Sequence, residues 1–156
     1  MRRACASAAA TEAAGEDFAE VVASGDVVLL SGPLGAGKTT FVRGLARGLG
    51  VLERATSPTF TMVREHRCHN DRGIATLHHA DLYRVGSLDE VLDLALGELV
   101  EEQSIAVIEW GEIAAPLFGA DVLAVDIEVV SDDERLVRVG GALAARRAAA
   151  LARWSA

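Results

Sequence analysis

The sequence is poor in cysteine, proline and aromatic residues, and it has no long apolar run. Its 156 residues include two cysteines and three prolines, and 4% are aromatic. Cys5 and Cys68 share no ligand spacing, so we expect a reduced, intracellular chain without a disulfide framework. No segment approaches the roughly 18 apolar residues of a membrane span, and the alanine-rich start lacks the leucine core of a secretory signal. These absences predict a cytoplasmic protein with no membrane partner.

Positive charge is also scarce. The chain has 15 Lys and Arg against 23 Asp and Glu, a net charge of −8. A free-standing nucleic-acid binder needs basic surface to neutralise phosphates, so we expect no tight, independent RNA binding. Residues 38–84 hold eight basic and four acidic side chains, whereas residues 85–134 hold fourteen acids and neither Lys nor Arg. This asymmetry indicates an anion-binding half beside a partner-facing half, or simply solvated helix faces in the acidic half.

The hydrophobic pattern predicts one α/β domain. The apolar runs at 27–31 and 104–109 are typical of strands buried on both faces. Thr11 is a candidate cap for a first helix, and the chain before it is expected to be a flexible N-terminus, residues 1–10. The other expected elements are helices at 11–24, 38–49, 87–96 and 142–154, a hairpin of strands 58–66 and 73–80, and strands 121–130 and 135–139. Residues 11–156 are thus expected to form a single three-layer domain with a central, mainly parallel sheet and an added antiparallel hairpin.

A glycine-rich segment links the first apolar strand to the next helix. It reads Gly-Pro-Leu-Gly-Ala-Gly-Lys-Thr from Gly32 to Thr39 and matches G-x-x-x-x-G-K-[ST], the Walker A phosphate loop. The glycines allow successive backbone N–H groups to converge on phosphate oxygens at a helix N-terminus. Lys38 is the only lysine of the chain, and a compact ammonium fits between two phosphates where a planar guanidinium does not. Thr39 offers a hydroxyl to Mg²⁺.

Two carboxylates end apolar runs near this loop. Asp81 follows the run Ile-Ala-Thr-Leu-His-His-Ala, and Glu109 follows Ser-Ile-Ala-Val-Ile. A P-loop enzyme needs a carboxylate on a neighbouring strand for the Mg²⁺ shell, and these two are the candidates, although either could be a solvated strand-end acid. Ser57-Pro58-Thr59 supplies hydroxyls where many P-loop proteins have a switch that senses the γ-phosphate, or it is a plain turn.

Histidine and cysteine side chains gather in the predicted hairpin. We do not expect these residues to form a zinc site, because the H-x-C-H spacing is irregular and no second cysteine pair completes it. Local polarity at the hairpin tip is the preferred interpretation. The residues concerned are His66, Cys68, His69, His78 and His79.

Four segments, in this order, resemble one family. They are GPLGAGKTT at 32–40, SPTFTMV at 57–63, HADLYR at 79–84 and IEWG at 108–111. Over residues 11–140 the chain is similar to the TsaE family, the bacterial ATPase of tRNA threonylcarbamoyladenosine biosynthesis. The resemblance implies ATP or ADP and Mg²⁺ as cofactors, and it implies a Mg-dependent ATPase that is weak without its partners.

The resemblance also assigns roles to residues. It implies that Lys38, Asp81 and Glu109 are catalytic, and that Thr39 and Glu109 lie at Mg²⁺ with Asp81 in the same shell or one water away. Trp110 matches the tryptophan that follows the family's glutamate, and Ser57 to Thr59 match its switch segment. The implied nucleotide contacts are Thr11, Leu34, Gly35, Ala36, Gly37, Lys38, Thr39, Thr40 and Arg135.

The implied function is accessory. The family docks on a two-protein threonylcarbamoyl-transferase complex that modifies the adenosine beside the anticodon of certain tRNAs, and it meets tRNA only indirectly or within that assembly. A small-molecule kinase is a weaker alternative, because residues 85–134 contain no arginine for a lid. A GTP switch is excluded, because an N-K-x-D motif needs a second lysine. A non-hydrolytic, nucleotide-gated assembly factor stays open.

Overall fold

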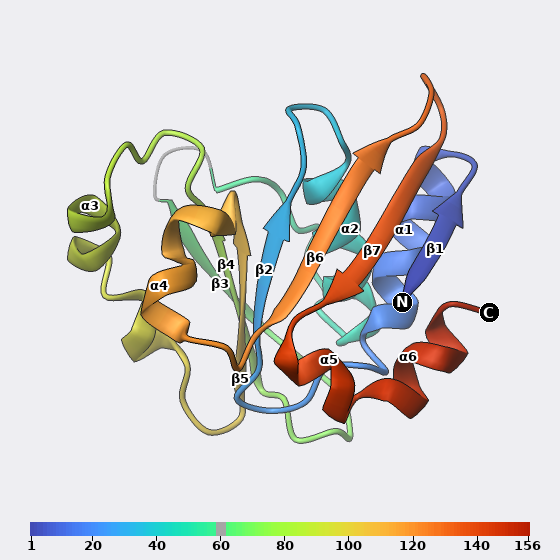
Figure 1. The fold of residues 1–156 in the computed structure, drawn as a ribbon. Coiled ribbons are helices and arrows are strands. Elements are labelled where there is room, and N and C mark those ends of the chain that lie inside the picture. The colour runs from blue at the N-terminus through green and yellow to red at the C-terminus, as the bar shows by residue number, and fades with distance from the viewer. Residues whose placement is uncertain (59–61) are drawn as a thin grey trace.

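A computed structural model describes residues 1–58 and 62–156 of the chain. The strands of this part form one seven-stranded sheet in the order β1-β7-β6-β2-β5-β4-β3 (Figure 1). The four central strands β6, β2, β5 and β4 run parallel, whereas β3, β7 and β1 are antiparallel to their neighbours. The strands are β1 (Arg2–Cys5), β2 (Val27–Ser31), β3 (Val63–Arg67), β4 (Thr76–Asp81), β5 (Ser104–Glu109), β6 (Leu123–Val129) and β7 (Arg135–Gly140). The expected mainly parallel sheet with an antiparallel hairpin is confirmed.

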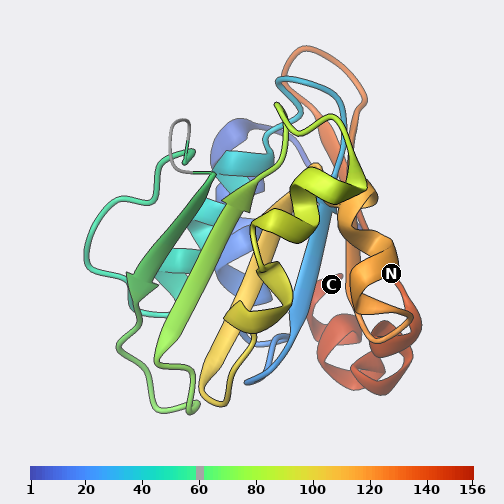
Figure 2. The ribbon, with the colours of Figure 1, turned by 90° about the vertical axis from the view of Figure 1, so that its left-hand side faces the viewer.

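Helices cover both faces of the sheet and complete the three layers (Figure 2). On one face α1 (Ala8–Phe18) and α2 (Lys38–Gly48) share a core with α5 (Ala142–Arg146) and α6 (Ala148–Trp154). On the other face, α3 (Leu88–Asp93), α4 (Ala115–Phe118) and the 3₁₀ turns η1 (Leu96–Leu99) and η2 (Gly111–Ala114) pack over a second core. Among the helices that the structure describes, none is both long enough and apolar enough to cross a membrane.

Helices α1 and α2 pack unusually closely, because glycines lie between them. A Cβ atom built on Gly44 would lie 1.8 Å from the carbonyl oxygen of Glu12, so only glycine fits there. The rings of Phe18 and Phe41 meet at 5.4 Å between centroids, and Trp154 of α6 packs edge-on against Phe18 at 5.7 Å. This packing fixes α2, and with it the residues at its N-terminus, against the sheet.

The first ten residues, which were expected to be flexible, contain a strand and the start of the first helix. Residues 2–5 form β1, which pairs with β7, and the amino group of Met1 donates to the carbonyl of Val139 at 2.9 Å. The first helix begins at Ala8 rather than at residue 11, and its cap is Ser7 rather than Thr11. The Ser7 hydroxyl accepts a hydrogen bond from the Ala10 amide at 3.1 Å. Strand β1 has no local sequence signal, because its partner β7 comes from far along the chain.

Other boundaries also shift. The strand expected at 58–66 begins only at Val63, and its residues 59–61 lie outside the described residues. The single C-terminal helix is divided into α5 and α6 at Arg147, although the segment 142–154 contains neither glycine nor proline. The division follows from tertiary packing, since Leu143 and Leu151 each reach the core from a separate helix.

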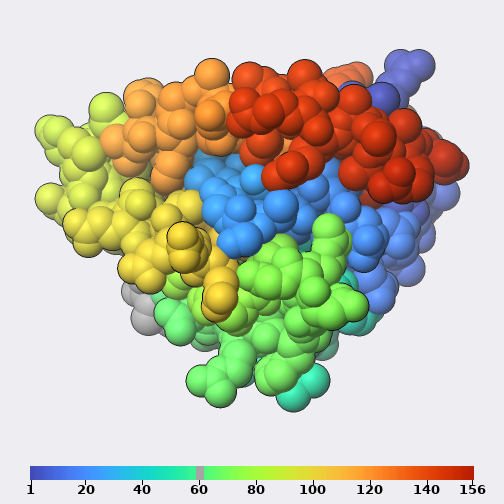
Figure 3. All heavy atoms as spheres, turned by 90° about the horizontal axis from the view of Figure 1, so that it is seen from below, coloured from blue at the N-terminus to red at the C-terminus, as the bar shows by residue number. Residues whose placement is uncertain are grey.

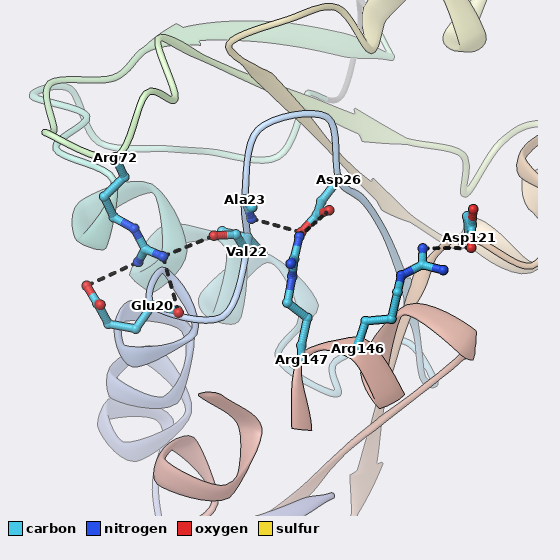
Figure 4. A network of polar contacts seen from close by, with 8 residues as sticks. All are labelled: Glu20, Val22, Ala23, Asp26, Arg72, Asp121, Arg146 and Arg147. Atoms are coloured by element: carbon cyan, nitrogen blue, oxygen red, sulfur yellow. Dashed lines mark hydrogen bonds and ion pairs between the residues drawn. The ribbon is translucent and has the colours of Figure 1, made fainter. Parts of the chain in front are cut away.

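The end of the sheet where the parallel strands begin is closed by polar contacts. The Arg72 guanidinium donates to the carbonyls of Glu20 and Val22, and Arg147 donates to the buried carboxylate of Asp26 at 3.1 Å (Figure 4). Arg72 also donates to the carbonyl of Ala19. In the space-filling view, the loop before β2 lies between the C-terminal helices and the turn of the β3–β4 hairpin (Figure 3). The opposite end, where the parallel strands finish, holds the glycine-rich loop.

Candidate functional site

The glycine-rich loop leaves the end of β2 and turns into α2. Gly32 has φ +136, and a Cβ atom there would lie 2.5 Å from the carbonyl oxygen of Ile127, so the turn requires glycine. Gly37 caps α2 in the left-handed region with φ 101, and no side chain caps the helix. The first N–H groups of α2 therefore have no side-chain acceptor, which is the arrangement that receives phosphate in P-loop proteins.

Lys38 is the first residue of α2 and its side chain folds back over the loop. Its Nζ donates to the carbonyls of Gly32 at 2.7 Å and Pro33 at 2.9 Å, and it lies 3.9 Å from the centre of the Trp110 ring. Burial lowers the pKa of the Lys38 ammonium from its ordinary value, and the nearby carboxylates, Glu109 first among them, partly offset this effect. The ammonium is thus held in the loop, next to the carboxylates.

Glu109 ends β5 and faces the start of α2. The Thr39 hydroxyl donates to its carboxylate, with Oγ1 2.9 Å from Oε1 and 3.2 Å from Oε2. The imidazole of His79, on β4, contacts the same carboxylate, with Nε2 2.8 Å from Oε1. Glu109 is 3% exposed, so this buried carboxylate joins β4, β5 and α2 at one point.

Asp81 lies beside Glu109, because the two residues are register partners on the parallel strands β4 and β5. Its Oδ2 accepts a hydrogen bond from the Ser57 hydroxyl at 2.8 Å, and its Oδ1 accepts one from the amide of Tyr83 at 3.0 Å. Ser57, from the segment expected to act as a switch, therefore contacts one of the expected metal carboxylates. Thr59, the third residue of that segment, lies outside the part of the chain that the structure describes.

These groups surround one pocket of about 490 Å³ at the end of the parallel strands. Its wall on one side is aromatic, since the rings of Tyr83 and Trp110 meet at 5.1 Å between centroids. Trp110 adopts a left-handed backbone conformation with φ 58, which turns the chain directly after Glu109. The lining residues are Leu34, Gly35, Gly37, Lys38, Thr39, Thr40, Ser57, Pro58, Met62, Asp81, Tyr83, Arg84, Glu109 and Trp110.

A smaller pocket of about 130 Å³ adjoins the other side of the loop. The remaining expected contacts, Thr11, Ala36 and Arg135, all line it. The Arg135 guanidinium donates to the carbonyl oxygen of Ala36 at 3.0 Å and to that of Gly35 at 3.4 Å, and so ties the β6–β7 turn to the glycine-rich loop. The fold therefore gathers the expected site residues around two adjoining pockets.

Sequence reasoning missed the place of His79. It was grouped with the other histidines as local polarity at the hairpin tip, yet it is fully buried under the site and contacts Glu109. His66 instead points to Glu53, with 2.8 Å between Nδ1 and Oε1. Strand alternation could have separated the two, because His79 stands two residues before Asp81 and so shares its face of the sheet.

A buried strand, a glycine-rich loop and a helix that begins with Lys-Thr beside a strand-end carboxylate define a P-loop domain. The domain is of the nucleotide-binding type. The family model "Threonylcarbamoyl adenosine biosynthesis protein TsaE" matches residues 5–137. The chain therefore belongs to the TsaE family, which takes part in tRNA threonylcarbamoyladenosine biosynthesis. The resemblance read from the four motifs is confirmed.

Individual relatives agree with this assignment. The tRNA threonylcarbamoyladenosine biosynthesis protein TsaE of Treponema pallidum (strain Nichols) is 39% identical over 137 residues, which cover 86% of this chain and 98% of that protein. The protein of the same name from Streptomyces coelicolor is 48% identical over 99 residues, covering 63% of this chain and 65% of that protein. The crystal structure of Bacillus subtilis YdiB is similar with a TM-score of 0.74 and 30% identity, over 99% of this chain and 93% of that one.

Proposed function

We propose that this protein binds ATP with Mg²⁺ in the pocket at the loop and hydrolyses it to support threonylcarbamoyl transfer to tRNA adenosine in the cytoplasm. The observation that carries the proposal is the contact between Thr39 and Glu109 at 2.9 Å, at the start of α2 and beside the glycine-rich loop. A hydroxyl and a carboxylate are the kinds of group with which a P-loop enzyme holds its cation, so this contact supports the proposal.

The donor set fits Mg²⁺ chemically. Mg²⁺ prefers hard oxygen ligands and binds through one or two carboxylates together with substrate phosphates and waters. The Thr39 hydroxyl gives its hydrogen to Glu109, which leaves the lone pairs of its oxygen for a cation. Asp81 adds a second carboxylate on the neighbouring strand. When bound, Mg²⁺ neutralises charge on the transferring phosphate and orients it.

The loop residues fit a triphosphate. The uncapped N–H groups at the start of α2 offer hydrogen bonds to phosphate oxygens. The Lys38 ammonium, now shared between two loop carbonyls, exchanges these neutral acceptors for charged ones when phosphate binds. Glu109 and Asp81 are the groups that hold or orient the attacking water, and Trp110 lines the same pocket beside them.

We propose that the protein acts on tRNA through the two-protein transferase complex. The names of its relatives place them in tRNA threonylcarbamoyladenosine biosynthesis. The net charge of −8 suits a protein that docks on other proteins better than one that holds tRNA by itself. We therefore expect slow hydrolysis by the isolated protein and faster hydrolysis in the assembly.

The test is steady-state ATP hydrolysis by the purified protein, alone and with the two transferase proteins added. The proposal predicts Mg-dependent hydrolysis that the partners stimulate strongly and that Glu109→Ala removes more completely than it removes ATP binding. ATP binding without any stimulation would favour the nucleotide-gated assembly factor instead. Normal partner-stimulated hydrolysis in Glu109→Ala would reduce Glu109 to a structural strand-end acid.

A further inference from the structure

His79 contacts the site from behind its wall. Its side chain is 0% exposed, and it does not belong to the residues that line the described pocket. Strand alternation puts His79 and Asp81 on the same face of β4, which is the face that α2 covers. From there its Nε2 reaches Oε1 of Glu109 at 2.8 Å. The imidazole thus touches a carboxylate of the site without reaching the space of the pocket.

The chemistry of the two groups sets the direction of this hydrogen bond. An ionised carboxylate can only accept, so Nε2 of His79 must donate. Nδ1 of the same ring is buried and has no hydrogen-bond partner among the described residues. Nε2 therefore carries the hydrogen that lies between the two side chains, and this hydrogen bond is the one polar contact of the ring among the described residues.

The carboxylate of Glu109 is held by two donors from different elements. His79 donates from β4, and the Thr39 hydroxyl donates from the start of α2. A side chain held by one donor alone could still rotate about its terminal bond, whereas two donors fix its plane. Partners of this kind orient metal-binding carboxylates in many proteins.

We infer that His79 is a positioning residue: its Nε2–H holds Glu109 in the orientation that serves the cation, without itself touching nucleotide. The inference rests on the proposed function, because it assigns His79 a part in the same Mg²⁺ site. It differs from a purely structural role, which would affect folding but not the dependence of nucleotide binding on Mg²⁺.

The chain contains a matched control in the same hairpin. His66, on β3, is 1% exposed, its Nδ1 lies 2.8 Å from a carboxylate oxygen of Glu53, and its other ring nitrogen is also buried without a partner among the described residues. It therefore shares the burial and the carboxylate contact of His79. The carboxylate that His66 contacts belongs to Glu53, which does not line the main pocket.

The experiment measures how nucleotide binding depends on Mg²⁺ in the full chain. The fluorescence of methylanthraniloyl-ADP is titrated with Mg²⁺ for the wild type, His79→Leu, His79→Gln and His66→Leu. We expect His79→Leu to raise the apparent Mg²⁺ dissociation constant by about 10- to 100-fold while nucleotide binding in EDTA stays unchanged. His79→Gln should restore most of the affinity, because its amide N–H₂ can donate from near the position of Nε2. His66→Leu should behave like the wild type.

Three outcomes of this titration would overturn the inference: wild-type Mg²⁺ dependence in His79→Leu, no recovery in His79→Gln, or an equal loss in His66→Leu. Thermal unfolding of each variant shows whether it is folded. If His79→Leu does not fold, His79→Asn replaces it, because the shorter amide cannot reach Glu109 whereas the glutamine can. Equal Mg²⁺ dependence in the Asn and Gln variants would then overturn the inference.

A second readout needs no ligand. Long-range ¹H–¹⁵N spectra of the nucleotide-free protein report the tautomer of each imidazole, and the signal lost in His79→Gln identifies His79. The inference predicts a hydrogen on Nε2, and a ring whose Nε2 carries no hydrogen would overturn it. A wild type that shows no Mg-dependent nucleotide binding would contradict the proposed function, whereas the tautomer would still decide the His79–Glu109 hydrogen bond.

Discussion

The side chain of Lys38 shows why a lysine suits this position in the glycine-rich loop better than an arginine. Its ammonium is shared between two loop carbonyls and the face of Trp110, and it is buried beside negative charge. An ammonium is a compact donor that can turn from these acceptors to phosphate oxygens, whereas a guanidinium is a planar fork with fixed directions. The two carbonyls thus hold the ammonium in place until phosphate oxygens replace them as its acceptors.

Replacing Lys38 therefore has a specific expected result. Lys38→Ala should weaken ATP binding by at least about tenfold, because a charge-assisted hydrogen bond contributes about 1.5–3 kcal/mol. Lys38→Arg should not restore it. Isothermal titration with ATP and Mg²⁺ measures this, and Arg47→Ala, on the same helix but outside the pocket lining, is the control. Unchanged affinity in Lys38→Ala would contradict the assignment of the phosphate loop.

The thiol of Cys68 should make stability depend on alkaline pH. Burial raises its pKa from 9.0 to about 11. Between these values the unfolded chain releases the proton and the folded chain keeps it, so stability falls as pH rises, by up to about 1.4 kcal/mol per unit. Urea unfolding at several pH values measures this slope. Cys68→Ala should flatten this slope. Cys5, whose pKa burial also raises, adds to the slope that remains, and Lys38, whose pKa burial lowers, opposes it. An unchanged slope in Cys68→Ala would contradict the role given to this thiol.

Among individual residues, motif and strand position predicted most of the site. The spacing from Gly32 to Thr39 specifies the loop geometry by itself. A carboxylate that ends a buried parallel strand lies at the edge of the sheet where ligands bind in α/β folds. His79 could not be placed as readily, because a histidine on a strand is a common core residue. Its role depends on which strand is the neighbour of β4, and the pairing of β4 with β5 is a property of the whole sheet.

Among elements, the α1–α2 contact carries a prediction that opposes helix propensity. Alanine favours a helix over glycine by about 1 kcal/mol. A Cβ atom at Gly44 would nevertheless lie 1.8 Å from the Glu12 carbonyl oxygen, so Gly44→Ala must push α1 and α2 apart. We expect a loss of about 1–3 kcal/mol in urea unfolding, as for other overpacked contacts.

The control for this substitution is Gly97→Ala. Gly97 has open space around its Cβ position and no left-handed φ, so the added methyl should change stability by less than about 0.5 kcal/mol. If both variants unfolded at the same urea concentration as the wild type, the close packing of α1 and α2 would not contribute to the free energy of unfolding.

The elements that the sequence predicted well are those whose pattern is local. The runs of β2 and β5 are apolar except at their ends, and their bounds agree with the expected 27–31 and 104–109. By contrast, β1 reads Arg-Arg-Ala-Cys and shows no strand pattern, because it exists only through its pairing with β7. The break at Arg147 likewise has no local signal and depends on the core that α5 and α6 meet.

At the scale of the whole molecule, the two ends of the sheet have separate tasks. One end holds the pocket, and the other is tied by ion pairs such as Arg147–Asp26 (Figure 4). Arg147→Ala should lower the unfolding free energy by about 1–2 kcal/mol, because Asp26 is buried, and it should leave nucleotide binding unchanged.

The control for Arg147→Ala is a substitution at the neighbouring residue, Arg146. Arg146 pairs with Asp121 at 2.8 Å, but their side chains are 57% and 71% exposed, so Arg146→Ala should cost less than about 0.5 kcal/mol. Urea unfolding and nucleotide titration of both variants test the separation. A loss of nucleotide affinity in a folded Arg147→Ala protein would show that the two ends are coupled.

The most direct test of the account is the yield of threonylcarbamoyladenosine in tRNA, measured with the two transferase proteins, ATP and either the wild type or Glu109→Gln. The account predicts that the wild type supports many rounds of modification per transferase complex. Glu109→Gln should bind ATP and the complex but sustain little beyond the first round. Equal, repeated turnover with both proteins would contradict the claim that hydrolysis at Glu109 supports the transfer.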